Sequence, residues 1–352
     1  MSSFAKKTRV LHISHHVGCM RDHIHVYEKL GFEYEFWKFY NDLFKISKEV
    51  ADRVWIEKKD YFNSFDFIVT SDTAPLSRIF MENIPELKPK VVVWICNRFD
   101  YNMEWDPSFY NIFNNVAKNH TDKFKIVPYS QFEAIWCHVR GIAPIRNVIT
   151  PTGINPIELD DKIDCLQTFK DKYILDSNSK ERFNDVSELT GKMFIPIYGN
   201  DNHYYKMKEI LEGSGIPCYN GGYNHSIDLK HCKGFVTFPE QYSKLITFET
   251  IQNEIIVFLP SEEFLIKLHP TRNNNYNYWF NSPVGHLNDR LVQLCEWYRF
   301  KECRIYFDSI EDLMYKIKNL TPEIVEEKKK WCRHYGALLN TENIEKWRAV
   351  FD

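Results

Sequence analysis

The chain has 352 residues, a length that favours two domains with separate cores over a single one. Its 45 Lys and Arg residues nearly balance its 48 Asp and Glu residues, so the net charge is −3. This balance does not indicate a protein that binds mainly nucleic acid or an anionic membrane surface. The aromatic content of 16% is high; it favours a core built from rings, with sugar-binding aromatic faces as the alternative.

Nine cysteines are spread along the chain without any C-x-x-C pair. Neither a disulfide framework nor a zinc ribbon is therefore expected, and the thiols are predicted to be reduced and mostly buried. The N-terminal stretch MSSFAKKTRVLHIS has too short an apolar segment for a signal peptide, and no run of about 18 apolar residues occurs. We therefore expect a cytoplasmic protein without a membrane span.

The first half of the chain alternates short apolar runs with segments long enough for helices. The expected strands cover residues 8–14, 66–70, 90–96, 124–128 and 148–150, and a helix is expected over about 20–30. Near-continuous apolar runs of this length are typical of strands buried on both faces of a parallel sheet with helical crossovers.

The second half repeats this alternation after a polar, charge-dense stretch from about 155 to 190. The expected strands cover residues 193–198, 216–219, 234–238, 255–259 and 304–307, and helices are expected over about 203–213 and 243–252. Residues 270–283 are rich in Asn and Tyr and are predicted to form a loop. Beyond Pro322 the pattern is helical to the end of the chain.

These patterns predict an α/β protein with two doubly wound, Rossmann-like domains facing a cleft, followed by a terminal helical tail. The predicted divisions are an N-terminal domain at 1–152, a linker at 153–190, a C-terminal domain at 191–321 and a helical tail at 322–352. Ligands of such sheets bind outside the carboxyl ends of the strands. The loops that follow the apolar runs are therefore the candidate sites.

Three polar loops in the first half hold the candidate catalytic residues. His16 lies in the first loop, Asp72 in the second, and Arg98 and Asp100 in the third. A carboxylate or an imidazole in such a loop can accept a proton from a substrate hydroxyl. For Asp72 a helix N-cap is an open alternative because Pro75 follows, and for Asp100 the alternative is a salt bridge with Arg98.

The common phosphate and metal signatures are absent from the sequence. It contains no G-x-G-x-x-G after a strand, no P-loop and no D-x-D. The nearest approach to D-x-D is Glu104-Trp105-Asp106, where the start of a helix at Pro107 explains the residues. Ligand spacing is also missing among the N-terminal histidines, which are His12, His15, His16, His23 and His25. No metal site is expected.

The window 238–261, FPEQYSKLITFETIQNEIIVFLPS, reads as a strand, a polar turn, a helix, a strand and a second helix start. Tyr242, Ser243 and Lys244 stand where the first helix begins, so free backbone N–H groups, a hydroxyl and a cation can meet a diphosphate there. Glu249 follows in the same helix, and its carboxylate can accept both hydroxyls of a ribose. An ordinary solvated helix position is the alternative for Glu249.

This window resembles the donor half of GT-B glycosyltransferases, which have a polar turn, a helix with a ribose-binding Glu, and a strand leading into a Pro-Ser-like turn. Tyr198 and Asn200, after the first strand of the second half, resemble the loop of that family near the donor phosphates. The segments WICNRFDY and YSKLITFE are similar to soluble glycosyltransferases of large algal viruses. The resemblance makes the N-terminal domain the acceptor side and the C-terminal domain the nucleotide-sugar-binding side. The tail, CRIYFDSIEDLMYKI and the helix after it, also resembles that fold, and this implies C-terminal helices that cross back to the first domain.

The activity that the resemblance implies is transfer of a sugar from a UDP- or GDP-linked donor to a glycan hydroxyl. Inversion at the anomeric carbon is expected, with no metal or other cofactor. The donor is expected at a set of second-half residues, namely Tyr198, Asn200, Tyr242, Ser243, Lys244 and Glu249. A sugar-nucleotide epimerase or hydrolase on the same fold, and a non-catalytic carbohydrate-binding protein, are the alternatives.

Asp72 ranks first as the catalytic base, ahead of His16 and Asp100. No cation stands within three residues of Asp72, so partial burial can raise its pKa toward the working pH. Arg98 stands close to Asp100 and is expected to keep the pKa of that carboxyl low. Substrate positioning is therefore the expected role of the Arg98 and Asp100 pair.

Overall fold

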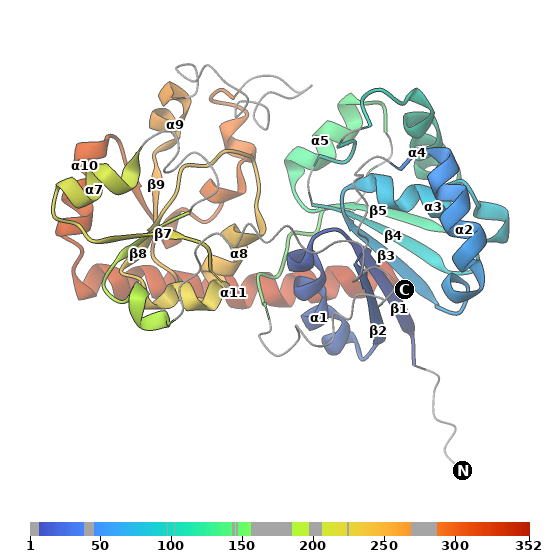
Figure 1. Cartoon of the computed structure of the whole chain (residues 1–352), viewed down its shortest axis with the longest axis horizontal. Helices are drawn as coiled ribbons and strands as arrows, with labels where there is room; N and C mark the ends of the chain where they lie inside the picture. The colour runs from blue at the N-terminus through green and yellow to red at the C-terminus, as the bar shows by residue number, and fades with distance from the viewer. Residues whose placement is uncertain are drawn as a thin grey trace, which may run out of the picture. The chain divides into compact units, whose positions relative to one another are not determined.

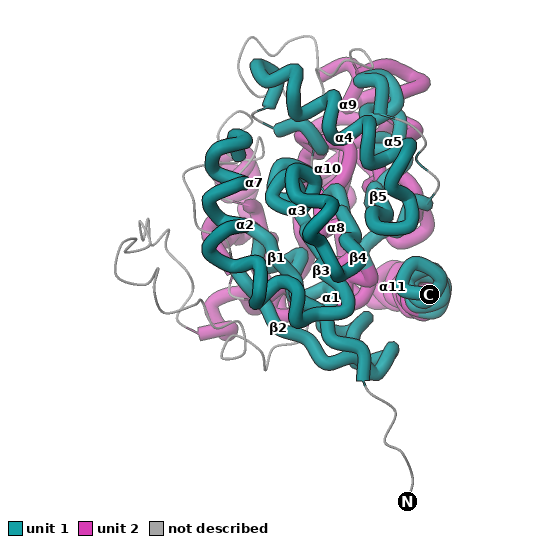
Figure 2. Tube along the Cα trace, turned by 90° about the vertical axis from the view of Figure 1, so that its right-hand side faces the viewer, with its two compact units in different colours: residues 1–151, 156–174, 341–352 teal, residues 152–155, 175–340 magenta. Residues whose placement is uncertain are grey.

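The computed structural model describes residues 7–38, 46–96, 98–101, 103–142, 145, 147–155, 185–196, 206–223, 225–268 and 287–352. These residues form two compact units (Figure 2). Unit 1 comprises the described residues up to Pro151 together with Thr341–Asp352, and unit 2 comprises Thr152–Asn155 together with the described residues from 185 to Asn340. Most of the predicted linker at 153–190 and the whole predicted loop at 270–283 lie outside the described residues.

Unit 1 is built on a five-stranded sheet with the order β2-β1-β3-β4-β5, in which every pairing is parallel. Its strands are β1 Arg9–Ser14, β2 Glu33–Lys38, β3 Phe67–Asp72, β4 Lys90–Ile95 and β5 Phe124–Pro128. All six residues of β3 are buried, and so are five of the six in β1 and in β4. The apolar runs are therefore covered on both faces, as predicted.

Helices cover both faces of this sheet (Figure 1). They are α1 Val17–Leu30, α2 Lys48–Phe62, α3 Arg78–Met81, α4 Pro107–Asn119 and α5 Gln131–Val139. On one face, Trp94 of β4 packs against His23 of α1 and against Trp347, close to the end of the chain. Elsewhere in the unit, Trp37 of β2 packs against Phe62 of α2. The aromatic residues thus build the core, as the preferred interpretation predicted.

Unit 2 is built on a second parallel sheet, with the order β10-β9-β8-β6-β7. Its strands are β6 Met193–Pro196, β7 Cys218–Gly221, β8 Gly234–Val236, β9 Val257–Pro260 and β10 Arg304–Phe307. Its helices are α7 Met207–Gly213, α8 Leu245–Gln252, α9 Glu262–Leu268, α10 Ile310–Lys318 and α11 Pro322–Phe351. Phe258, Phe307 and Leu313 belong to its buried core.

The predicted fold class is confirmed: the chain is an α/β protein with two doubly wound, Rossmann-like sheets. The last turns of α11 belong to unit 1, so the C-terminal helix returns to the first domain as expected. Two details differ from the prediction. The edge strand β2 was not predicted, and residues 148–150 form no strand.

The long helix α11 is polar along much of its length. None of the helices in the described ranges combines the length and apolar content needed to cross a membrane.

Candidate functional site

In unit 1 the strand order reverses between β1 and β3. Ligands of doubly wound sheets bind outside the carboxyl ends of the strands at this reversal. Ser14 ends β1, and Asp72 ends β3. His16 follows Ser14 as the N-cap residue of α1. The structure thus brings two of the four predicted first-domain residues to the reversal point.

Asp72 has an unusual backbone and a buried side chain. Its φ of 83° lies in the left-handed region, which residues other than Gly adopt rarely. The residue is only 8% exposed, and burial raises the pKa of its carboxyl although the nearby His16 opposes that shift. Thr73, rather than Asp72, is the N-cap of the short helix η1 Ala74–Ser77. The structure therefore does not support the helix-cap alternative, and strained backbone of this kind is common at functional sites.

The ends of β1 and β3 are tied together by hydrogen bonds. The backbone N–H of His16 donates to Ser14 Oγ over 3.1 Å, and Ser14 Oγ lies within 3.3 Å of the backbone oxygen of Ser71. Deeper in the unit, His12 Nε2 lies 2.8 Å from Ser71 Oγ, and the Tyr27 hydroxyl lies 3.0 Å from His12 Nδ1. This buried network positions the residue immediately before Asp72.

Asp100 lies in a different environment, where its carboxylate is held by the unit itself. Tyr110 donates its hydroxyl proton to Oδ2 over 2.8 Å, and the Trp136 indole N–H donates to Oδ1 over 3.1 Å. Arg140 Nε lies 3.2 Å from Oδ2, so Arg140 forms an ion pair with Asp100. These contacts give Asp100 a structural role within unit 1.

The expectation that the pKa of Asp100 is low is wrong. The pKa of Asp100 is raised rather than lowered, because burial outweighs the hydrogen bond from Tyr110 and the charges of Arg98 and Arg140. The guanidinium of Arg98 pairs with Glu104 over 2.5 Å and lies 4.6 Å from the centre of a Trp136 ring.

Glu133, in the first turn of α5, was not among the predicted residues. Burial and the neighbouring Asp100 raise its pKa to about 8, so this carboxyl is largely protonated at neutral pH. In the sequence, Glu133 stands three residues after Ser130, which caps the helix by accepting a hydrogen bond from the Glu133 N–H over 3.2 Å. That pattern indicates an ordinary helix start and gives no sign of the burial.

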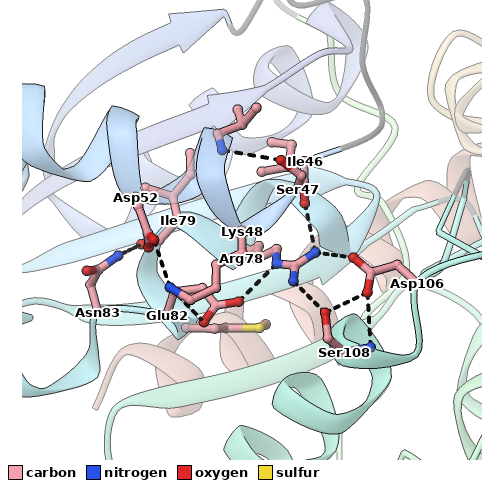
Figure 3. Close-up of polar contacts among 12 residues, drawn as sticks. Ile46, Ser47, Lys48, Asp52, Arg78, Ile79, Glu82, Asn83, Asp106 and Ser108 are labelled. Carbon is pink, nitrogen blue, oxygen red and sulfur yellow. Dashed lines mark hydrogen bonds and ion pairs between the residues drawn. The ribbon is translucent and has the colours of Figure 1, made fainter.

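Asp106 of the Glu104-Trp105-Asp106 segment is the N-cap of α4, as predicted. One Oδ atom accepts the N–H of Ser108 over 3.0 Å, and the other accepts a hydrogen bond from Arg78 over 2.5 Å. Arg78 also donates to Glu82, Ser108 and the backbone oxygen of Ile46 (Figure 3). These hydrogen bonds of Arg78 connect α3 to α4 and to the segment before α2. Both oxygens of the Asp106 carboxylate already accept hydrogen bonds within unit 1.

In unit 2 the strand order reverses between β6 and β8. The loop after β8 carries Tyr242, Ser243 and Lys244, and Lys244 is the N-cap residue of α8. Tyr242 and Ser243 are buried, and the Lys244 ammonium pairs with Glu240. Three of the predicted donor-binding residues are therefore at the reversal point. Tyr198 and Asn200, which follow β6 in the sequence, lie outside the described residues.

Glu249 lies in α8 with only 8% of its surface exposed, so it is not an ordinary solvated residue. Asn155 donates a side-chain hydrogen bond to its Oε1 over 3.3 Å. Gly153 packs so closely on α8 that an added Cβ would lie 2.5 Å from the backbone oxygen of Phe248. Gln252 of the same helix donates to the backbone oxygen of Thr152 over 2.7 Å. The segment 152–155 therefore fixes the side of α8 that carries Glu249.

The described residues include no group of three or more His, Cys, Asp or Glu side chains arranged to hold a metal ion.

No protein-family model matches this sequence, and no curated protein does either. Solved structures do match. A UDP-forming α,α-trehalose-phosphate synthase from Burkholderia xenovorans is 9% identical, with a TM-score of 0.50 over 98% of both chains. A UDP-N-acetylglucosamine 2-epimerase is 10% identical, with a TM-score of 0.46 over 93% of this chain and 91% of that one. The UDP-GlcNAc 2-epimerase of Methanocaldococcus jannaschii is 11% identical, with a TM-score of 0.41 over 95% of this chain and 99% of that one.

The likeness to the trehalose-phosphate synthase extends over nearly the whole chain. Together with the two reversed five-stranded sheets and the returning C-terminal helix, it shows that the chain has the GT-B type of fold.

Proposed function

We propose that this protein is a nucleotide-sugar enzyme, and more narrowly a glycosyltransferase that moves a sugar from a UDP- or GDP-linked donor to a glycan hydroxyl. The observation that carries the proposal is Asp72, a buried carboxyl with a left-handed backbone at the reversal point of the first sheet. The matched synthase, whose name describes it as UDP-forming, supports the same class of donor.

In the proposed reaction, Asp72 takes the proton of the acceptor hydroxyl. The acceptor oxygen then forms a bond to the anomeric carbon, and the bond from that carbon to the diphosphate oxygen breaks with inversion. The raised pKa of Asp72 suits it to this step because a stronger base accepts the proton more readily. Asp100, with both carboxylate oxygens occupied, is less suited to the role, and His16 is the remaining alternative.

Unit 2 is proposed to hold the donor. Backbone N–H groups at the start of α8, with Ser243 and Lys244, would face the diphosphate, and Glu249 would accept the ribose hydroxyls. Because the Lys244 ammonium pairs with Glu240, it attracts the diphosphate less strongly than an unpaired ammonium would. The backbone N–H groups at the start of α8 and the Ser243 hydroxyl would therefore supply much of the attraction for the diphosphate.

The deciding experiment measures consumption of UDP- and GDP-sugars with and without a panel of acceptor sugars. A glycosyltransferase releases nucleoside diphosphate in proportion to the glycoside formed. An epimerase changes the sugar without an acceptor, and a hydrolase releases free sugar. A protein that binds glycans without turnover would contradict the proposal.

We also propose that transfer needs no divalent metal. The predicted site residues include no D-x-D pair, and Asp106 is occupied by Arg78 and by the start of α4. Transfer should therefore persist in EDTA. Complete loss of transfer in EDTA that Mn²⁺ or Mg²⁺ restores would reject this part of the proposal.

A further inference from the structure

Trp105 differs from the other aromatic residues of unit 1 in its exposure to solvent. It is 56% exposed, whereas every other Phe, Tyr and Trp in the described part of that unit is buried or partly buried. A tryptophan side chain has a large apolar surface, whose contact with water is unfavourable. Single exposed apolar residues are nevertheless common, so the place and the support of Trp105 decide whether it has a role.

Trp105 lies in the segment between β4 and α4, which follows the carboxyl end of β4. Backbone hydrogen bonds join this segment to the loop of the proposed base. The N–H of Cys96 donates to the backbone oxygen of Asp72 over 2.9 Å, and the N–H of Ala74 donates to that of Phe99 over 3.1 Å. The segment therefore belongs to the edge of the sheet at which doubly wound folds bind their ligands.

Both sequence neighbours of Trp105 are fixed by buried arginines. Glu104 pairs with Arg98 over 2.5 Å, and Asp106 accepts a hydrogen bond from Arg78 over 2.5 Å (Figure 3). Both guanidinium side chains are almost completely buried. The two acids of the Glu104-Trp105-Asp106 segment thus fix the backbone on either side of the exposed indole.

An aromatic side chain on a fixed backbone loses little conformational freedom on binding, so such residues contribute strongly to recognition. The ligand that suits this indole has an apolar face to cover it and polar groups that stay in water. A pyranose ring has both, because C–H groups lie on its faces and most hydroxyls project from its rim.

We propose that Trp105 forms a glycan-binding subsite on unit 1, in which its indole stacks against a sugar ring of the acceptor. This inference rests on the proposed function, which supplies the glycan acceptor. Trp105 binds and orients the acceptor and takes no part in proton transfer. Its loss should therefore raise the KM for the acceptor, with little change in kcat or in donor affinity.

The test measures glycan binding by the full-length protein without donor, first on an array of defined oligosaccharides and then by calorimetry with those that bind. Trp105→Ala should weaken binding by about 10–100-fold, and Trp105→Phe, which keeps a smaller ring, should weaken it less. Tyr315→Ala is the matched control, because Tyr315 is an aromatic residue of α10 in unit 2 and is 65% exposed. It should leave binding unchanged.

A spectroscopic measurement locates the contact. The chain has nine tryptophans, and in protein labelled with 5-fluorotryptophan the ¹⁹F resonance that is missing from Trp105→Phe belongs to Trp105. This resonance should shift when an oligosaccharide that binds on the array is added. A purely structural role of the indole would leave the resonance in place. Unchanged denaturant midpoints would show that the variants are folded.

Transfer kinetics separate this proposal from the proposed function. If transfer occurs and Trp105→Ala keeps the acceptor KM within about twofold of the wild type, the subsite is rejected while the function stands. If no donor is consumed but glycans bind and depend on Trp105, the function is rejected while the subsite stands. The absence of both transfer and glycan binding would reject both.

Discussion

At the scale of single residues, Asp72 is buried, has a left-handed backbone, and lies at the reversal point of its sheet. We predict that Asp72→Asn lowers sugar transfer by about 10²–10⁴-fold, because the amide cannot accept the proton. Asn is among the residues that adopt positive φ most readily, so the backbone should be kept. The measurement is the rate of glycoside formation, together with donor affinity from calorimetry, which should not change.

Asp122→Asn is the matched control, because Asp122 is an exposed carboxyl of the same unit. It should leave transfer unchanged. Near-normal transfer in Asp72→Asn would move the role of the base to His16.

Glu249 supports a prediction about the donor. Glu249→Ala should weaken binding of the nucleotide by about 1.5–3 kcal/mol, the typical value of hydrogen bonds to a charged group. Titration calorimetry with UDP and GDP measures this change, and Glu209→Ala, at an exposed position of α7, should have no effect. Affinity within about twofold of the wild type in Glu249→Ala would contradict the assignment of Glu249 to the ribose.

The sequence indicated some of these residues and not others, for a physical reason. Asp72 and Glu249 could be found because a polar residue directly after an apolar run, or early in the following helix, stands at the carboxyl edge of a sheet. The environment of Asp100 could not be predicted. Its partners Tyr110 and Trp136 are 10 and 36 residues away and reach it from two different helices. Burial of Glu133 depends on the same packing.

At the scale of elements, strands buried on both faces were predictable and the edge strand was not. β4 has five apolar residues in succession and β3 begins with three, so these short apolar runs indicate both strands. The sequence of β2, EYEFWK, alternates charged or polar residues with rings because it forms the edge of the sheet. The apolar residues at 148–150 form no strand, but the backbone oxygen of Ile149 accepts the indole N–H of Trp94 over 3.1 Å.

Gly153 gives a prediction about how the segment 152–155 is fastened to α8. Its φ of 75° and its contact with the backbone of Phe248 leave no room for a side chain. Gly153→Ala should therefore lower the free energy of unfolding of unit 2 by about 1–2 kcal/mol for the backbone, plus about 1–3 kcal/mol for overpacking. Denaturant unfolding followed by hydrogen exchange in α8 measures this loss.

Gly141→Ala is the matched control, because its φ of 82° is similar but nothing lies within 4 Å of the added Cβ. It should show only the backbone cost. If both variants lost the same free energy of unfolding, the segment 152–155 could move away from α8 without cost, and close packing of Gly153 on α8 would not contribute to stability.

At the scale of the whole molecule, length and alternating pattern were enough to predict two parallel-sheet domains and a C-terminal helix, whereas the return of that helix to unit 1 was expected from the family resemblance. The return is stabilised in unit 1 by Trp347, which packs against His23 and Trp94, and by Asn343, which donates to the backbone oxygen of Thr150 over 2.8 Å. A terminal helix can be recognised from its pattern, but the unit it packs on depends on these distant contacts.

The buried titratable groups of unit 1 make its stability depend on pH with two opposite signs. Burial lowers the pKa of His23 to about 3 and that of His12 well below its ordinary value. Between about pH 3 and 6.5 the unfolded chain therefore binds a proton at His23 that the folded chain does not, and His12 acts in the same direction. Stability should rise with pH in this window by about 1.4 kcal/mol per pH unit for His23, and this contribution levels off above about pH 7.

Glu133 acts in the opposite sense, since its folded pKa of about 8 exceeds its ordinary value of 4.5. Between these pH values the folded state holds a proton that the unfolded state has released, so stability should fall as pH rises. The histidines of the unfolded chain have lost most of their protons above about pH 7, and the loss from pH 7 to 8 should reach about 1 kcal/mol. Glu133→Gln, which resembles the protonated acid, should remove this decline, whereas Glu57→Gln at an exposed position should not. Hydrogen exchange of the β3 and β4 amides across this pH range measures the difference, and parallel curves for wild type and Glu133→Gln would show that Glu133 ionises without cost to the fold.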